Sequence, residues 1–400
     1  MEPILQWFGH GFADLGLTGV AVYALLTTHV TIVCVTVFLH RSQAHRSLDL
    51  HPVASHLMRG WLWLATGIVT REWVAVHRKH HACCDTADDP HSPQTHGIRE
   101  VLLRGSELYR TASQDPQTLT VFSRGTSDDW LERNLYSRFS WYGIGVMLVV
   151  NVALFGALGL VVWAVQMAWI PVTAAGIVNG IGHWWGYRNF ESADASRNFS
   201  PWGILIGGEE LHNNHHTYPT SAKLSVKPYE FDIGWLYICI LQSLGLARVR
   251  KVAPRIQRGT VCQGADSATL QAVVANRFEI MAQFGLELRR AGRAEVHRVR
   301  REGGSSSSRL ADMRVAARWA HRDWAHIPAH LRERVALTVA SSEVLSKLLN
   351  MRSGLYALWS QTHVSADQLV VDLREWLRRA ENSGVEALCD TAANLRSIRV

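Results

Sequence analysis

Eight histidines of this 400-residue chain lie in three short motifs, and each motif adjoins a long apolar segment. The motifs read HRSQAH, HRKHH and HNNHH, and they contain His40, His45, His77, His80, His81, His212, His215 and His216. Neutral imidazole is a common protein ligand for iron, copper, zinc and nickel. One such motif could be a histidine-rich helix end satisfied by water and backbone, but three of them together predict a metal site.

The spacing within the second and third motifs suits helices. Residues three and four apart share one helix face, so His77 projects beside both His80 and His81, and the third motif repeats this pattern. In the first motif His40 and His45 are five residues apart, which is about 140° off a common face at 3.6 residues per turn. We therefore expect a helix to end there, with His40 on the helix and His45 at its frayed end.

The number of histidines limits the choice of metal. A structural zinc takes four ligands, usually with thiolates among them, and the six cysteines show no C-x-x-C spacing, Cys83 and Cys84 being interpreted as small residues after the second motif. Two ions that share eight or nine imidazoles would keep open positions, as oxygen activation requires. Ferritin-like di-iron proteins use paired Glu-x-x-His motifs, and no such pair occurs here. The sequence favours a histidine-rich centre of two irons.

A ninth histidine accompanies the three motifs. Asn179 and His183 lie four residues apart in NGIGHWWGYRNF, near the end of a long apolar segment. Polar groups at the border of a membrane span are costly unless they are paired, so such a pair predicts a functional role. We expect His183 to be a further metal ligand.

Apolar segments long enough to cross a membrane must position these motifs. Leu15 to Leu39 is one run of about 25 residues, which suffices for a hydrocarbon core of roughly 30 Å. Trp141 to Trp185 carries no formal charge and is long enough to cross twice, with a break expected at Ile170-Pro171. Pro52 to Thr70 must stay interfacial or re-entrant, because a full crossing would separate the first two motifs.

Basic residues cluster near the motifs, and the positive-inside rule therefore places the metal site on the cytoplasmic face. The residues in question are Arg41, Arg46, Arg71, Arg78 and Lys79. The expected fold is all-α and integral to the cell membrane, with few transmembrane helices, a cytosolic helical cap that holds the di-iron site, and a C-terminal helical region.

The motifs and their order resemble those of the integral-membrane fatty acyl desaturases of the stearoyl-CoA type. The resemblance covers Leu15 to about Pro254 and includes REWVAVHRKHH, DDPHSP, NGIGHWWGYRNF and GEELHNNHH. It implies that the nine histidines bind two irons and that Asn179 holds one iron through water. It also implies an enzyme that uses O2 and two electrons to introduce a cis double bond, at the delta-9 position, into a long-chain acyl-CoA or acyl-lipid.

Some members of that family carry a fused haem domain with an HPGG signature, which this sequence lacks. The expected electron source is therefore a separate carrier of ferredoxin, rubredoxin or cytochrome type, with its reductase. Metal-bound histidines usually donate their second N–H to a carboxylate or carbonyl. Candidates for this role, or for lining the substrate site, are Glu72, Trp73, Asp89, Arg188 and Glu209, together with the nearby acids Asp85, Asp88 and Glu210.

The C-terminal part differs in charge from the rest. Residues 1–250, the expected desaturase domain, carry 18 Lys and Arg against 19 Asp and Glu, whereas residues 251–400 carry 23 against 15. We expect a basic, mainly helical region of unassigned role, with a flexible segment near residues 303–308. Docking of the electron donor, contact with lipid headgroups and stabilisation of the cap remain open, and a nucleic-acid partner is not expected.

Two other functions share parts of this pattern. A di-iron membrane hydroxylase of alkanes or fatty acyl chains would use the same histidines, and it differs in ending with an alcohol instead of an alkene. A membrane metal transporter would need polar or acidic groups within its spans, and Leu15 to Leu39 offers only threonines and His29. The motifs thus favour desaturation over both alternatives.

Overall fold

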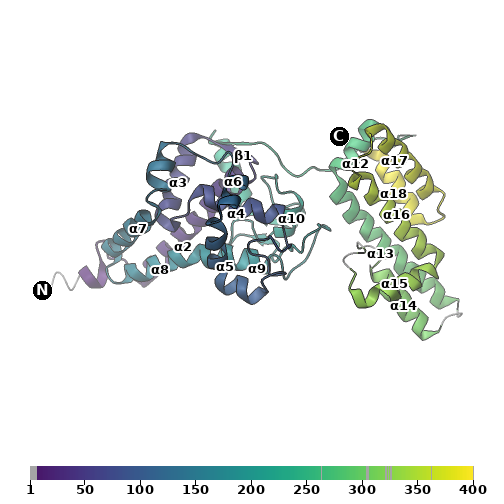
Figure 1. Cartoon of the computed structure of the whole chain (residues 1–400), viewed down its shortest axis with the longest axis horizontal. Helices are drawn as coiled ribbons and strands as arrows, with labels where there is room; N and C mark the ends of the chain where they lie inside the picture. Colours follow the sequence, from purple (N-terminus) through teal and green to yellow (C-terminus); the bar gives the residue numbers. More distant parts are fainter. Residues whose placement is uncertain are drawn as a thin grey trace. The chain divides into compact units, whose positions relative to one another are not determined.

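The computed structural model describes residues 7–262, 264–302, 306–319, 322, 324, 327–361 and 363–399. The chain forms two compact units, Met1–Ala253 and Pro254–Val400. The boundary expected after residue 250 lies three residues before this division. Both units are mostly helical, and Figure 1 labels their main elements.

The first unit combines α-helices with three π-helical segments and short strands. Its helices are α2 (Leu17–Cys34), η1 (Val35–Ala44), α3 (Pro52–Thr66), α4 (Thr70–Ala82), α5 (Ile98–Ser113), α6 (Pro116–Phe122), η2 (Glu132–Tyr136), α7 (Ser140–Phe155), α8 (Leu158–Ile170), η3 (Pro171–Val178), α9 (Asn179–Ile181), α10 (His212–Thr217) and α11 (Ile233–Ser243). Strand β1 (Leu48–Leu50) pairs antiparallel with β4 (Ala247–Val249), in the register Leu48 to Val249. Strands β2 (Trp202–Gly203) and β3 (Phe231–Asp232) pair in parallel.

Among the residues that the structure describes, two continuous helices are long and apolar enough to cross a membrane. They are Leu17–Ala44, 28 residues long, and Leu158–Ile181, 24 residues long. The second joins α8, η3 and α9, so the break expected at Ile170-Pro171 is wrong: Pro171 begins a π-helical turn inside the helix. The chain turns instead at Gly156, whose φ of 59° is accessible to glycine without strain.

The π-helix η1 changes the geometry of the first histidine motif. An α-helix would place His40 and His45 on different faces, but the π-helix hydrogen-bonds residues five apart, and the His45 N–H donates to the His40 carbonyl at 3.0 Å. Both side chains therefore leave one side of the chain. His45 is the residue that caps the helix end, as the sequence predicted, while the widened turn before it was not predicted.

A buried ion pair ties the first histidine motif to the segment after the third. Arg41 is 1% exposed, and its guanidinium donates to both carboxylate oxygens of Asp232 and to the carbonyls of Gly207 and Ala222. Asp232 also caps α11 by accepting from the Trp235 N–H. Arg41 thus locks the fold and is not one of the surface charges that the positive-inside rule counts.

The segment expected to be interfacial or re-entrant is helix α3, and it carries a buried charge. Arg59 contacts Glu132 and Asp129, and its side chain is 3% exposed. Because both acids come from the segment before α7, this ion-pair cluster attaches α3 to that part of the chain.

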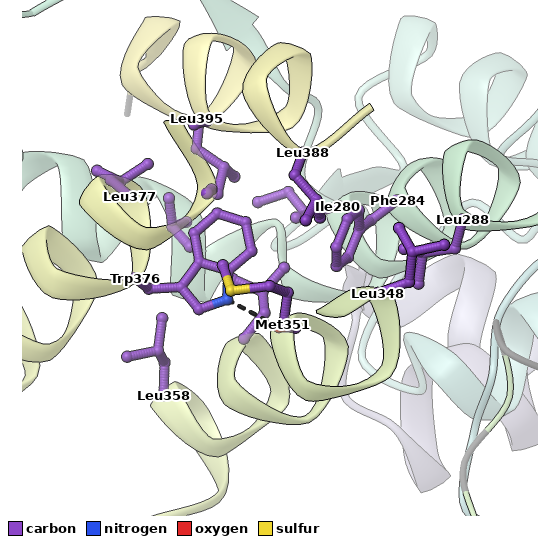
Figure 2. Close-up of a cluster of buried hydrophobic side chains, with 14 of the residues drawn as sticks. Ile280, Phe284, Leu288, Leu348, Met351, Leu358, Trp376, Leu377, Leu388 and Leu395 are labelled. Atoms are coloured by element: carbon purple, nitrogen blue, oxygen red, sulfur yellow. Dashed lines mark hydrogen bonds between the residues drawn. The ribbon is translucent and has the colours of Figure 1, made fainter. Parts of the chain in front are cut away.

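The second unit has its own hydrophobic core. Its elements are β5 (Gln257–Arg258), α12 (Ser267–Ala275), α13 (Arg277–Arg301), α14 (Ser307–Trp319), α15 (Ala329–Ala340), α16 (Glu343–Ser360), α17 (Ala366–Glu381), α18 (Glu386–Ser397) and β6 (Ile398–Arg399), with β5 and β6 antiparallel. Figure 2 shows Phe284, Met351 and Trp376 packed in this core, where the Trp376 indole N–H donates to the Met351 carbonyl at 2.8 Å. Of the segment expected to be flexible, residues 303–305 lie outside the described chain, and Ser307 and Ser308 begin α14, which corrects that expectation for these two.

Candidate metal centre

The nine predicted histidines converge in the first unit. The helix end at η1 supplies two of them, α4 supplies three and α10 supplies three, while His183 follows α9 directly. Six of the nine are at most 9% exposed, including all three on α10. Segments far apart in sequence therefore bring the imidazoles into one interior region. The nine histidines form two groups there.

The first group contains five histidines, whose potential ligand atoms lie within 4.8 Å of one another: His40, His45, His77, His81 and His215. The Nε2 atom of His215 lies 3.1 Å from that of His40 and 2.9 Å from that of His81. His45 and His77 approach each other through Nε2 atoms at 2.8 Å. Five ring nitrogens thus face a common point.

The second group contains the remaining four histidines. His80, His183 and His216 have ligand atoms within 4.8 Å of one another, and the Cys84 thiol belongs to the same cluster. His212 joins through its Nε2 atom, which lies 3.0 Å from that of His183. His80 and His81, adjacent on α4, point into different groups. One turn of α4 therefore supplies histidines to both groups.

A carboxylate lies close to the Nδ1 atom of four of the histidines. Each of these contacts joins an Nδ1 atom to an acidic side chain: His40 to Glu209 at 2.8 Å, His80 to Asp89 at 3.0 Å, His183 to Asp85 at 3.3 Å, and His216 to Asp194 at 3.0 Å. The His40 Nδ1 atom lies close to Glu209 without hydrogen-bond geometry. At His80, His183 and His216 this contact is a hydrogen bond, which fixes the tautomer that carries its proton on Nδ1 and leaves the Nε2 lone pair free. The acids therefore orient these rings for ligation through Nε2.

The acids are themselves held in place. Asp89 also accepts the backbone N–H groups of Asp85 and His91. Burial disfavours the charged form of Asp89, but the hydrogen bond and charge of His80 outweigh it and hold the pKa of Asp89 below its usual range. Asp194 is likewise fixed by Ser192 and Ser196, which donate to its carboxylate. The acids are thus ionised acceptors at neutral pH.

Four of the histidines outside the two long apolar helices have a lowered pKa and are neutral at physiological pH. Burial, reinforced by the charges of neighbouring histidines, lowers the pKa of His77, His81 and His215 well below the ordinary value. Burial also lowers the pKa of His216 to about 4, although Asp194 opposes this shift. Metal ions bind the neutral imidazole, so these groups need not lose a proton to act as ligands.

The donor set fits two metal ions that prefer nitrogen ligands. The buried Nε2 atom of His216 has no hydrogen-bond partner in the protein, and neighbouring Nε2 atoms lie 2.8 to 3.1 Å apart. A buried polar atom without a partner costs free energy, and a metal ion would satisfy several such atoms at once. The described residues thus offer five nitrogens for one ion and four for the other.

A cavity of about 490 Å³ adjoins both groups. Its wall includes His40, His77 and His212, and also the predicted residues Glu72, Trp73, Asn179 and Glu209. Trp73 stacks on His77 at a ring separation of 5.0 Å and an angle of 12°. Asn179 also lines this cavity. The cavity therefore gives a ligand direct access to the histidine clusters.

Glu72 behaves differently from the acids that orient histidines. Its carboxylate lies in the cavity wall, and burial raises its pKa although Arg71 opposes the shift. Among the described contacts, Glu72 makes none to a histidine nitrogen. We therefore assign it to the cavity lining.

Two basic candidates have structural roles. Arg188 does not line the cavity, and it donates to the carbonyls of Phe190, Ser192 and Asp194. It thereby shapes the loop that presents Asp194 to His216. Arg78, one of the basic residues near the motifs, donates to four backbone carbonyls, including that of Ala44 next to His45.

Sequence reasoning missed three residues of this region. Asp194 lies in a loop 22 residues before His216, and no spacing rule links the two. His91 lines the cavity and packs against His80 at a ring separation of 4.5 Å; its place in DDPHSP was the available signal. The Cys84 thiol lies 3.8 to 4.0 Å from nitrogens of His80, His183 and His216, so it is more than the small residue expected.

Replacing Asp89 with asparagine should weaken metal binding without emptying both positions. The change removes the carboxylate that orients His80, and loss of such a partner typically costs 10- to 100-fold in metal affinity. Iron retained against a graded series of chelator concentrations measures this effect. The neighbouring Asp88 is exposed, so Asp88→Asn serves as a matched control that should retain iron like the wild type. Equal retention in the two variants would contradict the role given to Asp89.

Comparison with known proteins agrees with this geometry. The fatty acid desaturase family model matches residues 17–230, which include all nine histidines. The chain therefore belongs to the fatty acid desaturase family, whose members are oxidoreductases. The second unit lies outside the matched range.

Several relatives share about 30% identity with the chain. The chain is 31% identical over 229 residues to a probable chloroplastic lipid desaturase of Arabidopsis thaliana, covering 56% of this chain and 62% of that protein. It is 30% identical to delta-9 acyl-lipid desaturase 2 of Arabidopsis thaliana, over 56% of this chain and 72% of the relative. It is also 30% identical to the sn-1 stearoyl-lipid 9-desaturase of Anabaena variabilis, and this match covers 56% of this chain and 80% of the relative. The chain thus matches less than two thirds of the length of the first of these relatives.

Proposed function

We propose that this protein is a membrane-bound, O2-dependent desaturase that introduces a cis double bond into a long-chain fatty acyl group, at the delta-9 position. The observation that carries the proposal is the set of nine histidines in groups of five and four beside one cavity. The relatives named as acyl-lipid and stearoyl-lipid 9-desaturases support both the regiochemistry and an acyl-lipid substrate. An acyl-CoA substrate is the alternative.

The nine histidines are the proposed ligands of two irons, with Asn179 holding one iron through water. Bound there, the metal pair with O2 would supply the oxidising chemistry needed to break unactivated C–H bonds. Overall, –CH2–CH2– with O2, two electrons and two protons gives –CH=CH– and two molecules of water. The electrons would come from a separate carrier of ferredoxin, rubredoxin or cytochrome type.

The protein's own residues bind and position the acyl chain. The cavity wall is largely apolar, with Val76, Ile170 and Val178 among its residues, and apolar burial favours entry of a hydrocarbon chain. Trp73, held flat on His77, limits how the chain can pass the metal site. Such confinement places one C–C segment beside the metals and lowers the entropic part of the barrier.

The proposed setting is a cell membrane with the metal site at the cytoplasmic face. The two long apolar helices support membrane insertion. Within them Arg41 is the only residue among Asp, Glu, Lys and Arg, and it is engaged by Asp232. A path for ion transport through these two helices therefore has no acidic groups, which disfavours the metal-transporter alternative.

Product analysis tests this proposal. Cells lacking unsaturated fatty acids should, on expressing the chain, accumulate a monounsaturated acyl chain with its double bond between carbons 9 and 10, as located by mass spectrometry. Cells that express the His80→Ala variant provide the control and should form no alkene. A hydroxylated acyl chain without alkene would instead indicate the hydroxylase alternative, and a double bond at another position would contradict the regiochemistry.

A further inference from the structure

Positive charge in the second unit is concentrated in one short stretch. Residues 289–318, which span the second half of α13 and almost all of α14, contain nine arginines and three acidic residues. The remaining residues from 251 to 400 contain 14 basic and 12 acidic residues. This stretch therefore carries three quarters of the charge surplus of the C-terminal region.

Six of these arginines are exposed and make no ion pair among the described contacts. We call them the arginine face: Arg293, Arg300, Arg301, Arg309, Arg314 and Arg318. On α13 the side of the helix that carries Leu288, Gly292 and Val296 is buried in the unit. Arg301 lies on the other side, Arg293 lies at the flank, and Arg300 lies at the exposed end of the helix, four residues after Val296. The arginines are therefore presented to solvent by a rigid helix.

Packing of α13 on α14 brings arginines of the two helices together. A Cβ added at Gly292 would lie 3.1 Å from that of Ala317, so these positions face each other. In an antiparallel helix pair with this register, position 300 lies opposite position 309. Arg300 and Arg309 thus belong to the same end of the helix pair, and like charges gathered in one place repel each other. An anionic partner would relieve this repulsion.

We propose that the arginine face binds the anionic phospholipid headgroups of the membrane that holds the first unit. Guanidinium groups match phosphate oxygens in geometry and charge. The inference rests on the proposed membrane placement of Met1–Ala253, because the direct link at Ala253–Pro254 keeps the second unit near that membrane. The surface of residues 289–318 favours a lipid headgroup over an acidic protein as the binding partner, for the following reason.

Protein interfaces usually have an apolar or aromatic centre within a polar rim. No large apolar side chain is exposed between Glu287 and Trp319 among the residues that the structure describes, Leu286 lying just before this range. A lipid headgroup surface requires no such centre, since it attracts clustered basic residues through its phosphates. The contact is therefore electrostatic and superficial, without insertion of side chains into the hydrocarbon region.

The test uses the full-length protein in lipid nanodiscs made of phosphatidylcholine alone or with phosphatidylglycerol. Phenylglyoxal modifies accessible arginines, and mass spectrometry reports the rate at each position. We expect the rates at the arginine face to fall about tenfold in the anionic discs, consistent with the attraction of several basic residues to an anionic surface. Arg379, which is exposed on α17, should react equally in both discs and provides an internal control.

Two further comparisons make the test decisive. The double variant Arg300→Gln/Arg309→Gln should lose most of the shielding at Arg293 and Arg314, whereas Arg255→Gln/Arg379→Gln, with the same charge change, should keep it. Raising the salt concentration should abolish the shielding, because exposed charges are screened. Equal rates in both discs, or shielding that arises only when an acidic protein or RNA is added, would overturn the proposal. The readout needs no turnover, so it is independent of product analysis.

Discussion

Replacing His80 with alanine should reduce desaturase activity by more than 100-fold and remove one of the two irons. His80 is 1% exposed and belongs to the four-histidine group, where its loss leaves three nitrogens. Loss of a residue that only orients a ligand costs roughly 10- to 100-fold in metal affinity, and loss of the ligand itself should cost more. Iron content and product yield of the purified variant measure the effect.

The control for this variant is His10→Ala. His10 lies outside the clusters with its side chain 63% exposed, so its replacement should leave iron content and activity unchanged. The His80→Ala protein should still insert into membranes, because the two apolar helices do not depend on His80. Full activity with two irons retained in His80→Ala would contradict the ligand assignment.

Replacing Asp232 with alanine should destabilise the first unit by about 3–5 kcal/mol, the typical cost of leaving a buried charge without its partner. Arg41 would remain 1% exposed with its guanidinium uncompensated. The N–H groups of Leu224 and Trp235 would also lose their acceptor. A lowered midpoint of thermal or denaturant unfolding in detergent solution measures this change.

A surface pair of the same chemistry provides the matched control. Asp49 contacts Arg248 and Arg250, and its side chain is 36% exposed. Because solvent and salt screen exposed ion pairs, Asp49→Ala should lower the unfolding midpoint far less. Equal destabilisation by the two substitutions would show that the Arg41–Asp232 pair does not hold the histidine motifs together.

The convergence of the nine histidines could be predicted because its signal is local. Spacings of three and four residues place imidazoles on one helix face, and the Asn179 and His183 pair repeats that spacing at the end of an apolar segment. The division into groups of five and four could not be predicted, because His80 and His81 are neighbours in sequence but belong to different groups. That division depends on how α4 packs against the other elements.

Other differences between the sequence-based expectations and the structure also come from interactions that the local sequence does not show. No residue type marks a π-helix, so the widened turn that aligns His40 and His45 was not foreseen. Pro171 suggested a helix break, yet its missing N–H is accommodated where an α-helix passes into a π-helix, and Gly156 makes the turn instead. Arg41 seemed to be a surface charge because its partner, Asp232, lies 191 residues away in sequence.

The acids that contact the histidines could likewise be predicted only where they lie near the motifs in sequence. Asp89 and Glu209 could be chosen because they lie near the motifs in sequence. Asp194 reaches His216 only through a loop shaped by Arg188 and two serines. Long-range positioning of this kind is visible only in the folded chain.

The most direct test of the account is the metal content of the purified protein. Elemental analysis combined with Mössbauer spectroscopy on protein expressed with ⁵⁷Fe should give two irons per chain in nitrogen-rich environments. That result is expected from five imidazoles around one ion and four around the other. A single metal per chain, or zinc in place of iron in a protein that forms the alkene, would contradict the two-iron centre.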